Sequence, residues 1–426
     1  MRDPALARFE ALYGPEFGHG LPIETNRIDK ALAALGDPHL RAPPVIHVAG
    51  TNGKGSTIAF MNAIAAAHGK TVHAFTQPHL IKLNERFQLA GAPVTDEALI
   101  DAAERIAATG VQLTQFEAQT AAAFLLFAEH STDLALLETG MGGRDDATNV
   151  IARPKAVALT PIAHDHVDVL GPSIADIAAH KAGVLKRNAI AICARQQNQA
   201  RDVINAIAEG KGVRVLHQGE DWDAYPAHGR LVVQTETRAL DLPLPALAGA
   251  HQIDNAGLAI ATLLAANLFP LEDAAVARAL RSAHWPGRLQ LLHTGALAQP
   301  VLEAGGELWV DGGHNPHAAE ALARWAAQMH ARRPLPLRLI IAMRARKDWR
   351  AFVDTLAPHA AHATTLWFGN GFVPANALAK AARDAGLDAD TATDITDAIK
   401  NAPQLPATRF LICGSLALAG QALEQA

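Results

Sequence analysis

The most constraining feature of the sequence is a glycine-rich segment, Gly50-Thr-Asn-Gly-Lys-Gly-Ser56. The apolar run Val45–Val48 before it is typical of a buried β-strand, and the stretch after it, to about His68, is typical of a helix. This is the context of a phosphate-binding loop, because glycines let backbone N–H groups approach phosphate oxygens and a helix N-terminus favours negative charge. The usual pattern G-x-x-x-x-G-K-[ST] would place glycine at Val48 and would not place Gly55 after the lysine. A variant P-loop in an α/β protein is therefore predicted.

This loop is expected to bind the phosphates of ATP. Lys54 would reach the terminal phosphates, and Ser56 would be a magnesium ligand. The other residues expected to contact the nucleotide here are Gly50, Thr51, Asn52, Gly53, Gly55 and Thr57. The alternative is a glycine-rich turn with a solvated lysine.

The rest of the chain alternates between β-branched apolar runs and alanine-rich helical patterns, which is typical of βαβ units and parallel sheets. In the first part, strands are expected at 134–137, 156–160 and 189–193, with a helix at 173–181 and a small antiparallel section at one sheet edge over 214–244. In the second part, strands are expected at 308–310, 339–341, 365–368 and 410–413, and helices at 317–330, 348–357, 375–385, 393–401 and the C-terminus. The break at His284–Arg288 separates the two parts, so we expect a domain at 1–293 and a smaller α/β domain at 294–426.

Composition excludes some classes of protein. The 426 residues carry a formal net charge of −5, which gives no sign of a nucleic-acid or membrane partner. The two cysteines, Cys193 and Cys413, lie in apolar runs and are expected to be buried thiols. The start of the chain lacks the apolar stretch of a signal peptide, and no run is long enough for a membrane helix, so a cytoplasmic protein is expected.

Polar residues follow several predicted strands, where the ligands of parallel sheets bind. Glu138 ends one strand and is a candidate magnesium ligand, with a solvated glutamate as the alternative. His164 and His166 follow the next strand, and two histidines beside an aspartate suit metal or phosphate chemistry. Lys181 ends the helix at 173–181, and its residue type alone favours a solvated helix-end cation.

Together these segments resemble the folylpolyglutamate synthase/dihydrofolate synthase family, a branch of the Mur ligases. The matching segments run in the family's order, at 47–56, 78–80, 84–86, 138 with 142–149, 165–166, 181–183, 249–256, 285–288, 311–316 and 413–416. The resemblance implies an N-terminal P-loop ATPase domain and a smaller C-terminal Rossmann-like domain. It also implies an ATP-dependent ligase that adds L-glutamate to dihydropteroate, to folate polyglutamates or to both, through an acyl phosphate.

The same resemblance implies roles for individual residues. Ser56 and Glu138 would hold one magnesium ion and His166 a second, and Lys181 matches a lysine that is carbamylated and serves as a metal ligand in the family. The residues expected to act in catalysis are Lys54, His166, Lys181, Asp311 and His314. Further contacts to ATP are expected from Gln252, Asn255, Arg288 and Asp311. Ser415 would assist with glutamate, and the family favours a monomer.

Five positions differ from the family's usual residues, and they bear on substrate preference and metal geometry: Gln77, Asp145, His164, His180 and Arg346. Two rival functions are a cell-wall Mur ligase and a nucleotide-dependent switch. The former normally carries a nucleotide-sugar domain before the phosphate loop, whereas this loop begins at Gly50. The switch would not need Arg288, Asp311 or His314.

Overall fold

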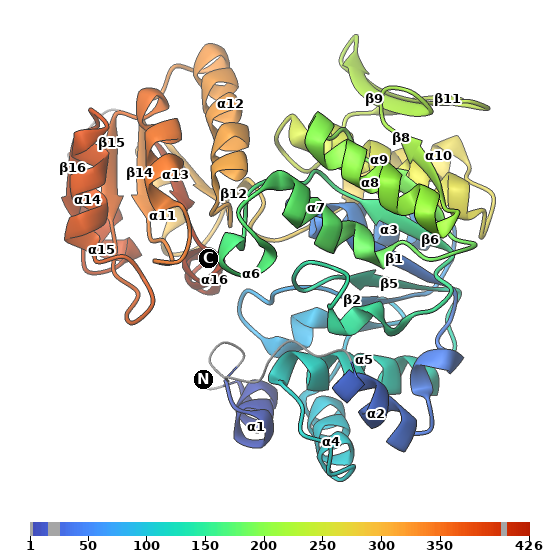
Figure 1. The fold of residues 1–426 in the computed structure, drawn as a ribbon. Helices are drawn as coiled ribbons and strands as arrows, with labels where there is room; N and C mark the ends of the chain where they lie inside the picture. Colours follow the sequence, from blue (N-terminus) through green and yellow to red (C-terminus); the bar gives the residue numbers. More distant parts are fainter. Residues whose placement is uncertain (1–2, 16–25, 402–406) are drawn as a thin grey trace. The chain divides into compact units, whose positions relative to one another are not determined.

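A computed structural model describes residues 3–15, 26–401 and 407–426, and its contacts divide the chain into two compact units. The first unit comprises residues 1–246 and 253–284, and the second comprises 247–252 and 285–426. The predicted two-part α/β organisation is confirmed (Figure 1). In the residues that the structure describes, no helix is long and apolar enough to span a membrane.

The first unit is built on an eight-stranded sheet in the order β4-β3-β2-β5-β1-β6-β7-β8. Its strands are β1 Val45–Ala49, β2 Val72–Phe75, β3 Phe87–Leu89, β4 Ala92–Pro93, β5 Leu134–Glu138, β6 Ala156–Leu159, β7 Ile190–Cys193 and β8 Arg214–His217. From β2 to β8 the neighbours are parallel, and β3 and β4 add an antiparallel edge. The central strand β1 lies between β5 and β6, so the residues that follow these three strands meet at one edge of the sheet.

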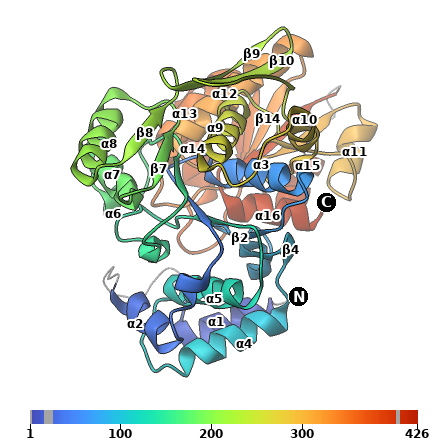
Figure 2. The same cartoon turned by 90° about the vertical axis from the view of Figure 1, so that its right-hand side faces the viewer.

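The helices of the first unit pack on this sheet or on one another. They are α1 Pro4–Tyr13, α2 Asn26–Ala34, α3 Lys54–Ala67, α4 Asp96–Ala107, α5 Gln115–Glu129, α6 Val167–Leu170, α7 Ile174–Lys181, α8 Asn198–Lys211, α9 His251–Ala266 and α10 Asp273–Ser282. One core gathers α1, α2, α4 and α5 over β1, β2 and β5, and another gathers α7 and α8 over β6 and β7. Helix α3 contacts β1, β2, β5 and α10, and the turned view shows it beside α10 (Figure 2).

The expected antiparallel section proved to be a sheet of its own rather than an edge of the main sheet. Strands β9 Trp222–Ala227, β10 Arg230–Thr235 and β11 Ala239–Pro243 form a three-stranded sheet in the order β11-β10-β9. Strand β8, at the start of the same segment, pairs parallel with β7 instead. Gly257 of α9 packs against Ala224, where an added Cβ would lie 2.2 Å from the alanine methyl, so the small sheet is anchored on α9.

The second unit carries a six-stranded sheet in the order β12-β13-β17-β14-β15-β16, parallel except for β12. Its strands are β12 Gln290–Leu292, β13 Glu307–Val310, β14 Leu337–Ile341, β15 His362–Thr365, β16 Ala389–Thr391 and β17 Arg409–Cys413. Its helices are α11 Ala298–Glu303, α12 Pro316–Arg332, α13 Trp349–Leu356, α14 Ala375–Asp384, α15 Ile395–Lys400 and α16 Leu416–Glu424. Because β12 pairs with β13, the second unit begins before residue 294.

One strand prediction in this unit was wrong. The run 365–368 was expected to be a strand, but β15 ends at Thr365. The hydroxyl of Thr365 donates to the carbonyls of Ala375 and Asp390, which ties the strand end to the following elements. Leu366 is still buried, but Trp367 after it is 57% exposed, so the chain leaves the sheet within this run. Cys193 and Cys413 are buried free thiols, as expected.

Candidate active site

The glycine-rich segment forms the predicted turn between β1 and α3. Gly50 has φ 139° and Gly53, the N-cap of α3, has φ 91°, conformations that favour glycine. A Cβ at Gly50 would lie 1.9 Å from the hydroxyl of Thr160, and one at Gly53 would lie 2.3 Å from the side-chain oxygen of Asn255. The loop is therefore held close to the end of β6 and the start of α9, with its last residues opening a helix.

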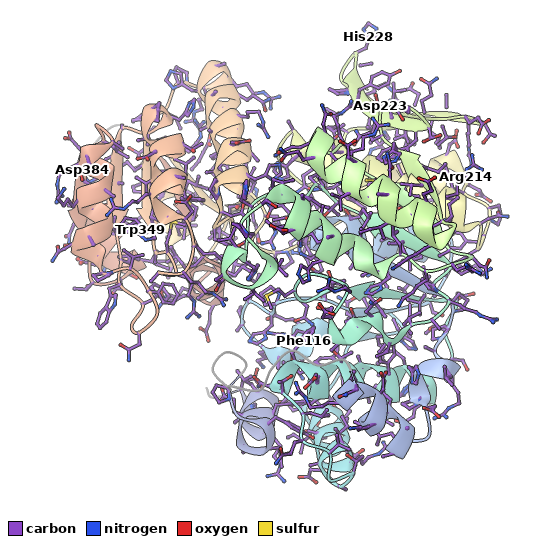
Figure 3. All side chains as sticks on the ribbon, in the orientation of Figure 1. Phe116, Arg214, Asp223, His228, Trp349 and Asp384 are labelled. Atoms are coloured by element: carbon purple, nitrogen blue, oxygen red, sulfur yellow. The ribbon has the colours of Figure 1, made fainter. Side chains whose placement is uncertain are left out.

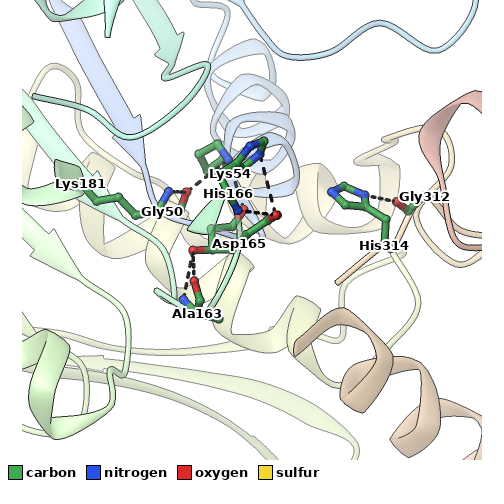
Figure 4. A network of polar contacts seen from close by, with 9 residues as sticks. Gly50, Lys54, Ala163, Asp165, His166, Lys181, Gly312 and His314 are labelled. Carbon is green, nitrogen blue, oxygen red and sulfur yellow. Dashed lines mark hydrogen bonds and ion pairs between the residues drawn. The ribbon is translucent and has the colours of Figure 1, made fainter. Parts of the chain in front are cut away.

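Two lysines converge on the carbonyl of Gly50 (Figure 4). Lys54 Nζ donates to the carbonyls of Gly50 over 3.3 Å and Thr51 over 3.2 Å. Lys181, only 5% exposed although it ends α7, donates from Nζ to the Gly50 carbonyl over 2.7 Å. Lys181 is therefore not a solvated cation at a helix end, because its ammonium group lies at the phosphate loop.

Glu138 lies beside this pair of lysines. It ends β5, opposite Val48 of β1, and is 3% exposed. One of its carboxylate oxygens is 3.7 Å from Lys54 Nζ, and the other accepts the backbone N–H of Gln77 over 3.0 Å. Ser56 is also buried, in the first turn of α3. The strand-end carboxylate and the phosphate loop are therefore neighbours, as the sequence predicted.

The histidine-containing segment after β6 is tied to the phosphate loop through Thr51. Its hydroxyl donates to the carbonyl of Ala163 over 3.1 Å and accepts the N–H of Ala163 over 3.0 Å. Three residues later His166 has φ 51°, and its N–H donates to the Asp165 carboxylate over 2.8 Å. His164, by contrast, is exposed.

These residues offer a hydroxyl, a carboxylate and an imidazole, donors that suit a divalent cation. Across residues 3–15, 26–401 and 407–426, no group of three or more His, Cys, Asp and Glu side chains is arranged to hold a metal ion. The candidate set Ser56, Glu138 and His166 includes only two residues of those types. Its chemistry fits a cation that is also held by phosphate oxygens.

A buried network behind the loop was missed by the sequence reasoning. Thr148 donates to the Asp146 carboxylate over 2.5 Å, and His47 Nε2 lies 2.8 Å from the same hydroxyl, to which it must donate. Asp146 also accepts the N–H of Met141. Burial raises the pKa of Asp146, and burial, with a smaller contribution from Lys186, lowers the pKa of His47 to about 3. The only sequence signal was a histidine inside the strand before the loop.

The second unit presents its candidates at the ends of β13 and β17. The Asp311 carboxylate accepts the N–H groups of Leu289 over 2.8 Å and Gly313 over 2.6 Å. Burial raises the pKa of Asp311, and the nearby guanidinium of Arg288 opposes this shift. His314 Nδ1 lies 2.8 Å from the carbonyl of Gly312, and Arg288 donates to the carbonyl of Gly287.

Three other predicted residues are placed as follows. Ser415 is the N-cap of α16 and accepts the N–H of Leu418 over 3.2 Å. Gln252 and Asn255 are both buried on α9, but Gln252 belongs by its contacts to the second unit and Asn255 to the first. Beside Gln252, burial lowers the pKa of His251 to about 4, with smaller contributions from Arg324, His317 and Arg288.

The unusual residues Asp145 and His180 lie together. Asp145 pairs with Arg144 at 2.8 Å, and His180 Nδ1 lies 3.5 Å from the same carboxylate. The backbone N–H of Arg144 donates to the His180 carbonyl over 2.7 Å. The glycine-rich turn after β5 is therefore fastened to the end of α7, next to Lys181. Arg346 is exposed in the segment after β14.

Comparison with known proteins adds independent findings. Residues 48–263 match the Mur ligase middle domain, and residues 287–416 match the Mur ligase glutamate ligase domain. The chain is 35% identical over 383 residues to a dihydrofolate synthase/folylpolyglutamate synthase of Bacillus subtilis, covering 86% of this chain and 85% of that one. It is 31% identical over 416 residues to a folylpolyglutamate synthase of Lacticaseibacillus casei, covering 92% of each.

Solved structures agree with these relatives. The structure of Escherichia coli FolC in complex with DHPP and ADP has a TM-score of 0.86 and 26% identity, covering 100% of this chain and 98% of that one. A bifunctional folylpolyglutamate synthase/dihydrofolate synthase with Mn, AMPPNP and L-glutamate bound has a TM-score of 0.86 and 28% identity, with the same coverage.

Proposed function

This chain belongs to the folylpolyglutamate synthase/dihydrofolate synthase family of Mur ligases, and from that premise we propose which of its residues carry out the reaction. The enzyme is an ATP-dependent ligase that joins L-glutamate to a folate-type carboxylate. The observation that carries the residue assignment is the convergence of Lys54, Lys181 and Glu138 at the glycine-rich loop.

The reaction must first activate a carboxylate, which is a poor acyl donor because oxide is a very poor leaving group. Transfer of the γ-phosphoryl group of ATP to a carboxylate oxygen gives an acyl phosphate and ADP. The amine of glutamate then attacks the acyl carbon, and the tetrahedral intermediate releases phosphate and a proton as the amide forms. The protein contributes positioning and charge neutralisation.

In the first unit, residues 50–56 would hold the triphosphate. The N-terminus of α3 has no side-chain cap and no acidic residue in its first turn, so its N–H groups suit phosphate oxygens. The flexible stem of Lys54 would let its ammonium group exchange the carbonyls of Gly50 and Thr51 for phosphate oxygens. Asn255, which lies against Gly53, would contact the nucleotide.

Ser56 and Glu138 would hold one magnesium ion and His166 a second. When bound, magnesium would neutralise phosphate charge and orient the attacking carboxylate. The Gln77 N–H and the Lys54 ammonium contact the two oxygens of Glu138 and hold this carboxylate beside the loop.

Carbamylation of Lys181 would reverse the sign of its charge. The neutral amine would add to carbon dioxide and lose one proton, giving a carbamate anion in place of an ammonium group. Its burial beside Gly50 supports this proposal, because a buried cation among metal ligands opposes metal binding whereas an oxygen anion favours it. Carbon-13 NMR after exposure to labelled carbon dioxide should give one carbamate signal that is absent from Lys181→Ala.

In the second unit, Arg288 would contact ATP phosphates, and Gln252 and Asp311 would contact the rest of the nucleotide. His314 and Ser415 would face glutamate. The two N–H groups on Asp311 hold its carboxylate in one orientation, so it can serve as a fixed acceptor. The Arg288 guanidinium beside it favours the ionised form.

We propose that the acceptors include both dihydropteroate and tetrahydrofolate polyglutamates, and that the chain works as a cytoplasmic monomer. The test is ADP release with glutamate and each acceptor supplied separately, followed by mass analysis of the products. Strict dependence on both substrates supports ligation, whereas ADP release that ignores them would indicate a nucleotide-dependent switch. A mass gain of one glutamyl residue on only one acceptor would restrict the specificity.

A further inference from the structure

The segment from Thr76 to Arg86 carries two sequence motifs, Pro-His-Leu and Asn-Glu-Arg, that the reaction scheme leaves without a role. Its ends close on each other, because the N–H of Thr76 donates to the carbonyl of Arg86 over 2.9 Å. Within it, the backbone N–H groups of residues 80–82 donate to the carboxylate of Glu85 over 2.7, 3.0 and 2.8 Å. The motif residues therefore build a loop with a fixed internal structure.

The side chain of Arg86 fills the centre of this loop and is only 1% exposed. Its Nε donates to His79 Nδ1 over 2.9 Å, which places the imidazole proton on Nε2. Its Nη1 donates to the side-chain oxygens of Gln77 over 2.7 Å and Gln119 over 2.8 Å. All three acceptors are side chains of the first unit, so the guanidinium ties residues 77, 79 and 119 together.

Gln77 connects this buried arginine to the active site. Its side-chain oxygen is held by Arg86, and its backbone N–H donates to Glu138 over 3.0 Å. The other oxygen of Glu138 lies 3.7 Å from Lys54 Nζ. A continuous chain of polar contacts therefore runs from Arg86 through residue 77 to the carboxylate at the phosphate loop.

We propose that Arg86 is a positioning residue, which fixes the orientation of Glu138 by holding Gln77 in place. The planar fork of the guanidinium serves three acceptors at once, so it sets the path of the chain at residue 77 and with it the direction of the N–H that Glu138 accepts. This inference rests on the proposed function, in which Glu138 is a metal ligand.

The test is direct metal binding rather than turnover. The dissociation constant of Mn²⁺ in the presence of ADP is measured by electron paramagnetic resonance for the wild type, Arg86→Lys, Glu138→Gln and the double variant. We expect Arg86→Lys, which keeps the charge and loses the fork, to weaken Mn²⁺ binding about tenfold, a typical effect of losing a partner that orients a metal ligand. In the double variant, Arg86→Lys should add no loss beyond that of Glu138→Gln, because both changes act on one carboxylate.

Other outcomes overturn specific parts of the scheme. Unchanged Mn²⁺ affinity in Arg86→Lys, or losses that add in the double variant, would refute the positioning role while leaving the metal assignment intact. Unchanged affinity in Glu138→Gln would refute the metal assignment itself.

Two further variants guard against a general loss of folding. Gln77→Ala keeps the backbone N–H and leaves Arg86 bonded to His79 and Gln119, so it should fold and weaken Mn²⁺ binding in the same direction by a smaller factor. If the Arg86→Lys protein does not fold, Gln77→Ala takes its place, alone and combined with Glu138→Gln. Arg409→Lys is the matched control, since Arg409 is also 1% exposed and donates to Glu307 over 2.7 Å in the second unit. It should lower the unfolding temperature and leave Mn²⁺ affinity unchanged.

Discussion

The two units hold their candidate residues by different means. In the first unit, Lys54, Glu138 and Lys181 come from segments far apart in the sequence: the two lysines meet at the Gly50 carbonyl, and Glu138 lies beside Lys54. In the second, the side chains of Asp311 and His314 contact backbone groups of residues 289–313. The first arrangement depends on the whole sheet, whereas the second depends on two neighbouring strand ends. Substitutions should therefore have wider effects in the first unit.

The largest effect is expected from Lys54→Ala. Loss of one preorganised charge at the transferring phosphoryl group should lower kcat/KM by about 10² to 10³, or roughly 3–4 kcal/mol. The unfolding temperature should change little, because the polar contacts of Lys54 within the described part of the chain are with loop carbonyls and Glu138. Steady-state kinetics and thermal unfolding check both expectations, and near-normal turnover would remove this lysine from the catalytic group.

A pair of glycine substitutions tests the comparison through stability. Gly50→Ala forces a Cβ to 2.8 Å from the Thr160 carbonyl at φ 139°, and backbone cannot give way easily. The three atoms nearest to a Cβ at Gly312 belong to the side chains of Leu416 and Arg288, which can move. We expect unfolding free energies lower by about 3 kcal/mol and about 1 kcal/mol respectively. Equal losses in urea titrations would show that the second site is as tightly built as the first.

The third prediction concerns pH. His47 stays neutral in the folded protein down to a pKa of about 3, whereas in the unfolded chain its pKa is near the ordinary 6.5. Between these values the unfolded state binds more protons, so stability falls as pH decreases, by about 1.4 kcal/mol per pH unit. His251, with a pKa of about 4, should act the same way over a narrower range.

Urea unfolding of the wild type and His47→Gln at pH 7, 6 and 5 isolates this contribution, because carboxylates titrate in both proteins and cancel. The stability advantage of the wild type should shrink as pH falls. An advantage that stays constant with pH would mean that His47 is not the titrating group.

The smallest effects are expected from single hydroxyls. Thr51→Val removes both hydrogen bonds to Ala163 and should lower the free energy of unfolding by about 1–2 kcal/mol. It should also raise the KM for ATP, because the histidine-containing segment loses its attachment to the loop. Ser415→Ala removes the N-cap hydrogen bond of α16 and should lower the free energy of unfolding by about 1 kcal/mol. A change in the KM for ATP with Ser415→Ala but not Thr51→Val would reverse the assignment of the two hydroxyls.

The sequence predicted best what depends on local order along the chain. The strand, turn and helix at 45–67 and the carboxylate at the end of β5 follow from patterns within a few residues, and parallel strands bring their ends to one edge. It could not show that β9–β11 form their own sheet, because alternation within a strand does not identify the neighbouring strand. It also could not show the role of Arg86, since two of its acceptors lie 9 and 33 residues away.

The hairpin of β9 and β10 offers an accessible position for attaching a fluorophore. Its turn, His228–Gly229, has φ of 50° and 75°, and His228 projects at the tip (Figure 3). Because both native thiols are buried and burial raises their pKa, to about 12 for Cys193, maleimide dyes should ignore them. The double variant His228→Cys/Asp384→Cys would then carry one fluorophore on each unit, and single-molecule energy transfer would test whether the distance between the two labels changes during turnover, without altering a catalytic side chain.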